Sequence, residues 1–493
     1  MRTASPARIV LGVIVAGTLV RLALAGSLGL GIDESYMVAA GRVLRLGYFD
    51  HPPLAWWLSA GAGRLLGETA FNVRLPFIAL FAGSTWLMFA LGELLVGARA
   101  GLWAAVALTL APEFSVAFGG WVLPDGPLDF FLLVAALSLT RALAGGAPWR
   151  WWLAAGVAAG AALLSKYSAV LVLAGAVLYL ATQPAHRGWL RRPQPYVAAL
   201  LALLVFAPVL VWNARHGWAS FAFQGARAGA EGLQPFGPLR VLGGGALFLL
   251  PWLWLPLLLA VWRALRAGPA DWRGWLPCCL GLPPVALFAL IGFWSRHVLF
   301  HWAAPGYLLL LPLLGAELDR LAARRPRLLR RALLGTLALY AVTVAFLVGE
   351  FRFDLLPTGA PWLAPLAKLE LQGRDWTPLR TTLAVRGLLG PGVLVGGVGW
   401  QETGKLDIAM RGAAPVICLN PDQRQYAFAP GMADHAGADV LIASVKPITA
   451  ESLARQGVRF DTLEGLAPVE VIQGGALFLS LGHRLHAHEP AGH

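Results

Sequence analysis

Long apolar stretches separated by short polar loops dominate the first 350 residues of this chain. Most stretches are about 17–24 residues long, which is enough for a helix to cross a hydrocarbon core of roughly 30 Å. Together with the loop charges they predict about eleven membrane-spanning helices, at 9–29, 75–97, 101–118, 127–143, 152–165, 168–182, 196–212, 239–262, 275–293, 302–318 and 332–349. Residues 1–350 are therefore predicted to form a transmembrane domain, which includes a long first loop at 30–74.

The composition supports a membrane protein and argues against nucleic-acid binding. Of the 493 residues 58% are hydrophobic and only 13% are charged, whereas about a quarter of the residues of a soluble protein are charged. Too few charged side chains remain to cover a water-facing surface. The formal net charge of +13 does not indicate a nucleic-acid partner, because the arginines gather in short loops between apolar stretches.

The loop arginines also predict an orientation. With the N-terminus in the cytoplasm, the arginine-rich loops lie on the cytoplasmic side, as the positive-inside rule requires. The opposite loops at 119–126 and 294–301 hold zero and one arginine. We expect the first span to be retained rather than cleaved as a signal peptide, because Arg21 interrupts its apolar core. Most polar and acidic residues then lie on the extracytoplasmic face, which is the predicted working face.

The composition changes at about residue 350. Proline-rich sequence predicts a linker, formed around Pro357, Pro361 and Pro365. Short apolar runs at 393–395, 439–442 and 477–479 predict buried strands between Gly/Pro turns. No apolar run in this region is long enough to span a membrane. Residues 351–493 are therefore predicted to form a small mixed α/β domain outside the membrane.

Two adjacent carboxylates, Asp33 and Glu34, follow the first predicted span. A helix end in water tolerates charge, so an exposed helix terminus is one interpretation. Alternatively, Asp33 lies at the rim of a cavity, where the loss of solvent would make it a useful general base. The pattern alone favours neither interpretation.

The same outer loop carries Asp50 and His51 immediately before two prolines. The prolines fix the backbone, and the Trp-rich stretch after them is expected to form a helix along the membrane interface. A turn before an interfacial helix accounts for this pattern. The pattern is equally consistent with a functional site, in which the rigid backbone directs the Asp50 carboxylate and the His51 imidazole toward a substrate.

Asp125 and Lys166 are ionisable residues at the edges of predicted spans. Asp125 belongs to a Pro-Asp-Gly-Pro sequence, which is typical of a turn and also offers an acid. Lys166 interrupts an apolar stretch. An ionisable group at membrane depth indicates function and predicts an anionic partner, whereas a lysine that reaches to the interface from a helix end is the alternative.

Three basic residues, Arg296, His297 and His301, occupy the loop at 294–301. Such groups suit a phosphate, and an interfacial anchor is the alternative. The acidic and basic motifs are all predicted on one side of the membrane. Their common placement is more informative than any one of them.

At these residues the sequence resembles glycosyltransferase family 39, which includes the dolichyl-phosphate-mannose protein mannosyltransferases and the bacterial lipid A aminoarabinose transferases. The resemblance covers about residues 8–350. It rests on Asp33-Glu34, on the Tyr-Phe-Asp-His-Pro-Pro-Leu segment and on Pro-Asp-Gly-Pro-Leu, with further elements at 164–167 and 301–307. It implies the GT-C fold, an all-α polytopic membrane architecture, here followed by the small α/β domain.

The resemblance also implies transfer of a sugar from a polyprenyl-phosphate donor to an acceptor hydroxyl on a lipid, a glycan or a protein. Asp33 takes the place of the family's proposed catalytic carboxylate, and Asp125 that of the second acidic motif. Asp50-His51 stands where the aminoarabinose transferases carry Glu-Lys. This difference weakens any transfer of the donor specificity and metal use of the aminoarabinose transferases to this chain.

The chemistry of such a transfer assigns further expected roles. The acceptor hydroxyl must lose a proton, for which Asp33 is the candidate base, oriented by Asp125 or Glu34. The departing phosphate needs positive charge, and a single displacement predicts inversion at the anomeric carbon. The candidate phosphate-binding residues are Lys166, Arg296, His297 and His301, and Asp50 and His51 are candidates for positioning the substrate. The motifs specify no cofactor, and a divalent metal bound by Asp50, His51 and His301 is an open alternative.

A lipid or sugar transporter or flippase is the main functional alternative, because buried charge also lines translocation paths. A transporter predicts repeat symmetry and broken spans at matched positions, and the sequence contains no such pairing. An inactive scaffold whose outer domain binds partners is a third alternative. The expected location is the bacterial inner membrane, with membrane lipids around the protein and no nucleic acid among its partners.

Overall fold

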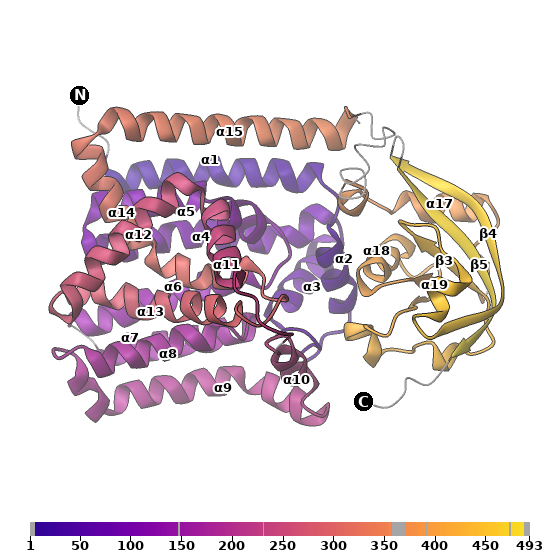
Figure 1. The fold of residues 1–493 in the computed structure, drawn as a ribbon, viewed down its shortest axis with the longest axis horizontal. Coiled ribbons are helices and arrows are strands. Elements are labelled where there is room, and N and C mark those ends of the chain that lie inside the picture. Colours follow the sequence, from indigo (N-terminus) through magenta and orange to yellow (C-terminus); the bar gives the residue numbers. More distant parts are fainter. Residues whose placement is uncertain are drawn as a thin grey trace. The chain divides into compact units, whose positions relative to one another are not determined.

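A computed structural model of the protein describes residues 5–145, 148–229, 231–353, 355–356, 370–390, 392–472 and 475–487. The predicted linker prolines, Pro357, Pro361 and Pro365, lie outside the described residues. The chain divides into two compact units (Figure 1). The first consists of Met1–Leu22, Arg45–Ala55 and Arg74–Ala341, and the second of Ala23–Leu44, Trp56–Val73 and Val342–His493.

The first unit is helical throughout the part that the structure describes. Its main helices, some of which continue into the second unit, are α1 (Pro6–Ser27), α4 (Ala70–Val96), α5 (Ala98–Leu110), α6 (Asp125–Ala144), α7 (Pro148–Ser165), α8 (Ala169–Thr182), α9 (Pro193–Arg215), α10 (Ala219–Ala226), α11 (Gly237–Leu249), α12 (Pro251–Ala267), α13 (Trp272–Ile291), α14 (Ala304–Arg324) and α15 (Pro326–Phe353). Short turns of other helix types are η1 (Glu113–Phe118), η2 (Arg187–Arg191), η3 (Gly268–Ala270) and η4 (Phe300–Ala303). The predicted all-α membrane architecture is confirmed.

A helix, or a pair of helices, lies at each predicted span. Among the described helices six are long and apolar enough to cross a membrane, namely α1, α4, α6, α9, α13 and α15, and a bent pair raises the number to seven. The count of eleven therefore stays a prediction. The predicted span at 239–262 stays a prediction, and the structure shows it as a bent helix pair in which α11 and α12 meet at an angle of 114°. The bend occurs at Leu250, whose φ is 72°, immediately before Pro251.

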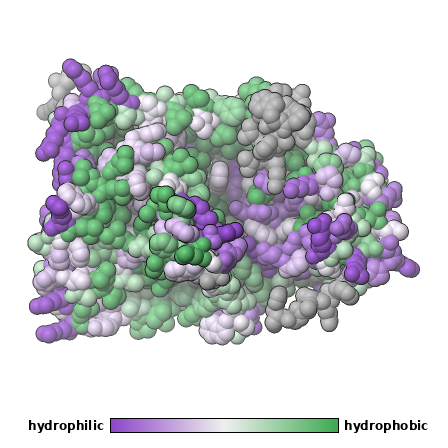
Figure 2. All heavy atoms as spheres, in the orientation of Figure 1, coloured by the Kyte–Doolittle hydropathy of each residue, from purple (hydrophilic) through white to green (hydrophobic). Residues whose placement is uncertain are grey.

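Close contacts between helices hold the first unit together. A Cβ atom at Gly156 on α7 would lie 2.4 Å from the Ala198 carbonyl oxygen on α9, so only glycine allows this approach. Two ion pairs join helices near the end that was predicted to be cytoplasmic: Arg99 of α5 pairs with Asp319 of α14 at 3.0 Å, and Arg263 of α12 pairs with Glu317 of α14. In Figure 2 hydrophilic side chains gather at one end of this bundle, and hydrophobic side chains cover much of its flank.

The second unit combines helices of the first outer loop with a C-terminal α/β domain. Its elements are α2 (Ile32–Gly41), most of α3 (Leu54–Leu66), α17 (Pro378–Val385), β1 (Leu394–Gly397), α18 (Trp400–Met410), β2 (Val416–Cys418), η6 (Arg424–Phe428), η7 (Ala433–His435), β3 (Val440–Ser444), α19 (Ala450–Ala454), β4 (Val458–Ile472) and β5 (Gly475–Ala487). The predicted α/β domain is confirmed, with β1, β3 and β5 at the predicted strands. The sequence analysis missed β2 and β4.

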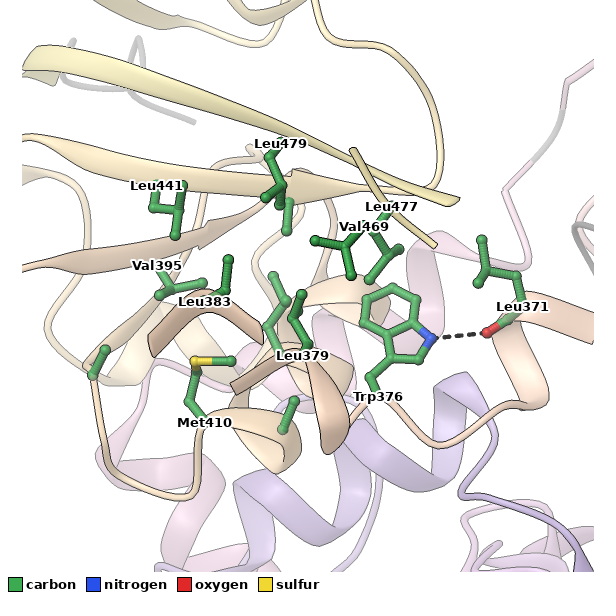
Figure 3. Close-up of a cluster of buried hydrophobic side chains, with 14 residues drawn as sticks. Leu371, Trp376, Leu379, Leu383, Val395, Met410, Leu441, Val469, Leu477 and Leu479 are labelled. Atoms are coloured by element: carbon green, nitrogen blue, oxygen red, sulfur yellow. Dashed lines mark hydrogen bonds between the residues drawn. The ribbon is translucent and has the colours of Figure 1, made fainter. Parts of the chain in front are cut away.

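The sheet of this domain has the strand order β2-β1-β3-β5-β4. Strand β1 runs parallel to β2 and β3, whereas β5 is antiparallel to both of its neighbours. One face packs against a core that includes Leu379 and Leu383 of α17, Met410 of α18, and Trp376 (Figure 3). The Trp376 indole N–H donates a hydrogen bond of 2.9 Å to the Leu371 carbonyl, so this buried ring leaves no unpaired donor.

Candidate active site

A buried ion pair joins two helix ends of the first unit. Lys166 follows the last residue of α7, and Asp125 is the first residue of α6. The Lys166 Nζ atom lies 2.7 Å from the Asp125 Oδ1 atom, and the two side chains are only 11% and 7% exposed. Because the consecutive helices α6 and α7 pack against each other along their length, the end of α7 lies beside the start of α6. Asp125 is thus the anionic partner that the position of Lys166 predicts.

Two further buried carboxylates surround this pair, and the sequence analysis missed both. Asp129 lies one helical turn after Asp125 on α6, is 3% exposed, and neither of its carboxylate oxygens has a hydrogen-bond partner among the described residues. Glu113 in η1 is also 3% exposed. Both carboxylates lie near enough to interact electrostatically with Asp125 and Lys166. The spacing of Asp125 and Asp129 places them on one helix face and is the signal that would have found Asp129.

His301 and Arg227 lie near the same ion pair. Burial, reinforced by the charge of Lys166, lowers the pKa of His301 to about 4, with a smaller lowering contribution from Arg227. His301 is therefore neutral at pH 7 and offers a hydrogen bond rather than a charge. The Arg227 guanidinium lies 4.3 Å from the centre of the Trp302 ring. Arg227 was not predicted, although it lies in an outer loop that was expected on the working face.

Asp50 lies close to the turn that carries Lys166. Its side chain is buried, and its backbone carbonyl accepts a hydrogen bond from the Gln224 amide. Burial raises the pKa of Tyr167, and the Asp50 carboxylate adds a smaller effect in the same direction. The His51 carbonyl accepts a hydrogen bond of 3.2 Å from the Tyr48 N–H.

The candidate metal ligands Asp50, His51 and His301 do not gather into a metal-binding group. Within the residues that the structure describes, no three His, Cys, Asp or Glu side chains are placed to bind one ion. The nearest cluster of carboxylates, around Asp125, contains the ammonium group of Lys166. The residues around Asp125 therefore form a buried charged cluster rather than a metal centre.

Arg296 and His297 occupy an exposed part of the loop before α14. The His297 Nε2 atom lies 2.7 Å from the Glu231 Oε1 atom, and the Arg296 backbone N–H donates a hydrogen bond of 2.9 Å to Glu231 Oε2. In the part of the chain that the structure describes, neither the Arg296 nor the His297 side chain contacts the Asp125–Lys166 pair. Their role in binding phosphate stays a prediction.

The two carboxylates at the start of α2, in the second unit, have different surroundings. Glu34 is buried, and its Oε2 atom accepts a hydrogen bond of 2.9 Å from the Gly31 N–H, so it caps the helix. Asp33 keeps an exposed surface and accepts a hydrogen bond of 3.1 Å from the Gln401 amide of α18. The protein around Asp33 displaces enough water to raise its pKa above the ordinary value, although Gln401 and Arg424 act in the opposite direction.

Contacts between α2 and α18 position Asp33. A Cβ atom at Gly404 of α18 would lie 2.6 Å from the Tyr36 backbone nitrogen of α2, so glycine permits the close packing. The Arg42 guanidinium lies 2.6 Å from a carboxylate oxygen of Asp407 and 2.6 Å from one of Glu68. The C-terminal domain thereby contributes directly to the surroundings of a residue that the sequence assigned to the transmembrane domain.

Sequence comparison places this chain near known glycosyltransferases. Residues 50–212 match the sequence model of the family described as dolichyl-phosphate-mannose-protein mannosyltransferase. Over 293 residues the chain is 25% identical to the lipid A galacturonosyltransferase RgtD of Rhizobium johnstonii, covering 56% of this chain and 58% of that protein. The chain thus matches less than two thirds of the length of this relative.

Structural comparison gives a match over almost the whole chain. The structure of ArnT from Cupriavidus metallidurans bound to undecaprenyl phosphate has a TM-score of 0.68 at 17% identity, covering 97% of this chain and 98% of ArnT. The arabinofuranosyltransferase AftD from Mycobacteria has a TM-score of 0.52 at 15% identity, covering 98% of this chain and 42% of AftD. At these identities the likeness concerns the fold. Together the comparisons confirm the resemblance to glycosyltransferase family 39 and show that the chain has the GT-C glycosyltransferase fold.

Proposed function

We propose that the protein transfers a sugar from a polyprenyl-phosphate donor to an acceptor hydroxyl. The observation that carries the proposal is the buried Lys166–Asp125 pair, with Arg227 and neutral His301 beside it, in a chain with the GT-C fold. Two cations held near a membrane-embedded helix end suit the phosphate of a lipid-linked donor. The matched ArnT structure was solved with undecaprenyl phosphate bound.

The proposed working face is extracytoplasmic. Helix α14 lies at the predicted span 302–318, whose crossing of the membrane stays a prediction, and its 21 residues correspond to a length of about 30 Å. His301 comes shortly before its first residue, whereas Arg320 lies near its last. The positive-inside rule assigns the arginine-rich end to the cytoplasm, so the end near His301 faces outward. The expected location is a bacterial inner membrane.

The proposed reaction is a single displacement at the anomeric carbon. The acceptor oxygen forms a bond to this carbon while the bond to the phosphate oxygen breaks, and the phosphate leaves with the bonding electrons. Asp33, whose raised pKa suits a base, takes the acceptor proton. Lys166 and Arg227 stabilise the departing phosphate. Phosphate is a good leaving group, so the reaction needs no general acid and inverts the configuration, in contrast to a retaining glycosidase.

A glycan or glycolipid is the proposed acceptor class, because the curated relative RgtD is described as acting on lipid A. The transport alternative is not favoured, since the family model and the relatives are glycosyltransferases. The test supplies the purified protein with a radiolabelled polyprenyl-phosphate sugar and with lipid, glycan or protein fractions. Labelled product is the expected result. Movement of donor across vesicles without any product would overturn the proposal in favour of a flippase.

The hydrogen bond from Gln401 to Asp33 provides a pH prediction. This bond stabilises the ionised carboxylate and so lowers the pKa of Asp33. Gln401→Leu is therefore expected to raise that pKa, and the acid limb of the rate profile should move to higher pH because the base is protonated sooner. The measurement is kcat/KM as a function of pH, with Gln423→Leu in the same unit as the matched control. An unchanged acid limb would show that Asp33 is not the base that accepts the proton.

Arg227 provides a prediction about the donor. Arg227→Gln is expected to raise the KM for the polyprenyl-phosphate sugar about tenfold or more, because a charge-assisted contact to phosphate is lost. Arg296→Gln is made in parallel, and a larger effect at Arg227 is expected because the charge of Arg227 acts on His301, which also interacts with Lys166. If the KM rises by the same factor or less in Arg227→Gln than in Arg296→Gln, the result would favour phosphate binding by the loop at 294–301.

A further inference from the structure

A pocket lined by seven polar side chains and by apolar groups lies in the second unit, at the carboxyl ends of two parallel strands. Its volume is 350 Å³, which lies in the range of pockets that hold small ligands. Its lining includes residues that follow β1, residues at and after the end of β3, and residues of α19 and the turn after it. The polar lining consists of Gln372, Gln401, Glu402, Ser444, Lys446, Ser452 and Gln456.

The position of this pocket in the sheet is the one that open α/β sheets use for ligands. From β1 the chain passes through α18 to β2 on one side, whereas β3 lies on the other side of β1. The connections leave β1 and β3 in opposite directions, and this divergence opens a crevice beyond the strand ends. We call this site the switch-point pocket.

The side chains of the switch-point pocket suit a carbohydrate. Three amides, a carboxylate, two hydroxyls and an ammonium group supply both donors and acceptors, as the hydroxyl groups of a sugar require. Ile32, Val398 and Ile448 offer apolar surface for the C–H face of a sugar ring. The Gln456 Oε1 atom is buried without a hydrogen-bond partner among the described residues, so a ligand hydroxyl would satisfy it.

The switch-point pocket also adjoins the proposed base. Gln401 lines the pocket and donates its hydrogen bond to Asp33, and Ile32 precedes Asp33 in the chain. We propose that the switch-point pocket binds a sugar unit of the acceptor and so selects a glycan rather than a protein hydroxyl. This inference rests on the proposed glycosyltransferase function, but saccharide binding can be measured without any transfer.

The test measures binding of chitobiose and of cellobiose to the full-length protein by saturation-transfer NMR. A zwitterionic detergent without a sugar headgroup is required, since a maltoside would compete for the site. Two single variants are tested, Gln456→Leu and Lys446→Ala, the second at an exposed side chain. Each is expected to weaken disaccharide binding about threefold to tenfold, because each removes one hydrogen bond to the ligand. The matched control Gln423→Leu alters a half-buried glutamine of the same unit that does not line the pocket.

The outcomes separate this inference from the proposed function. Absence of binding by the wild-type protein, or binding unchanged in both variants, overturns the saccharide site even where transfer occurs. Binding of inorganic phosphate that depends on Lys446, without disaccharide binding, overturns it in favour of an anion site. Variant-sensitive disaccharide binding without any transfer supports the pocket and refutes the transferase. In an active enzyme both variants should raise the KM for a glycan acceptor and leave the KM for the donor unchanged.

Discussion

Asp33→Asn is expected to lower the rate of glycosyl transfer by about 10²–10⁴-fold, the range that a positioned general base contributes. The substitution keeps the shape of the side chain and an oxygen that can accept the Gln401 hydrogen bond, but it removes the proton acceptor. Asp33 also keeps an exposed surface, so the change should leave the thermal stability of the protein almost unaltered. The measurement is kcat with saturating donor and acceptor, beside a melting curve in detergent.

Asp434→Asn is the matched control for this prediction. Asp434 lies in the same unit, is exposed, and accepts a local hydrogen bond from the Gly431 N–H. The control should retain the wild-type rate, which would show that the loss at Asp33 is not a general effect of removing a carboxylate. Wild-type turnover by Asp33→Asn would remove this residue from the mechanism and leave the base unassigned.

Lys166→Met is expected to lower both stability and transfer. Removal of the ammonium group leaves the Asp125 carboxylate buried near Glu113 and Asp129 without its counter-charge. Breaking a buried ion pair in this way costs about 3–5 kcal/mol. Donor binding should also weaken, because one of the two cations proposed for the phosphate is lost. The measurements are the melting temperature in detergent and the KM for the polyprenyl-phosphate sugar.

A second substitution separates the two effects of Lys166. The double variant Lys166→Met with Asp125→Asn removes both charges, so it should recover much of the stability but none of the activity. Arg99→Gln breaks the exposed pair with Asp319, in which the arginine side chain is 68% exposed, and should cost only about 0–1 kcal/mol. An active double variant would show that the buried pair stabilises the helices and takes no part in donor binding.

Local patterns were sufficient to place the helices and several strands. An apolar stretch of sufficient length must form a helix in lipid, because every backbone N–H and C=O group needs a partner inside the segment. Each predicted span accordingly coincides with a helix or a helix pair. The bend at Leu250 was missed because the apolar character continues across it, so hydropathy contains no sign of the change in direction.

The contacts within the candidate site were predicted less completely than the residue types that form it. Asp125 and Lys166 were recognised separately, since each interrupts an apolar pattern, but 41 positions separate them and their pairing depends on how α6 and α7 pack. Glu113 and Asp129 were overlooked because their neighbours are ordinary span residues. Arg227 was overlooked because loop arginines are common, and only folding brings it near His301.

The amino-acid sequence alone was enough to predict a multispanning protein, the residue types at its working end, and the resemblance to a glycosyltransferase family. These properties depend on local composition and on short motifs, which persist in the unfolded chain. The sequence could not show that Asp33 faces Gln401, or that strand order opens a pocket beyond β1 and β3. Those features depend on contacts between residues more than 300 positions apart or on the order of strands, which only the packed tertiary structure establishes.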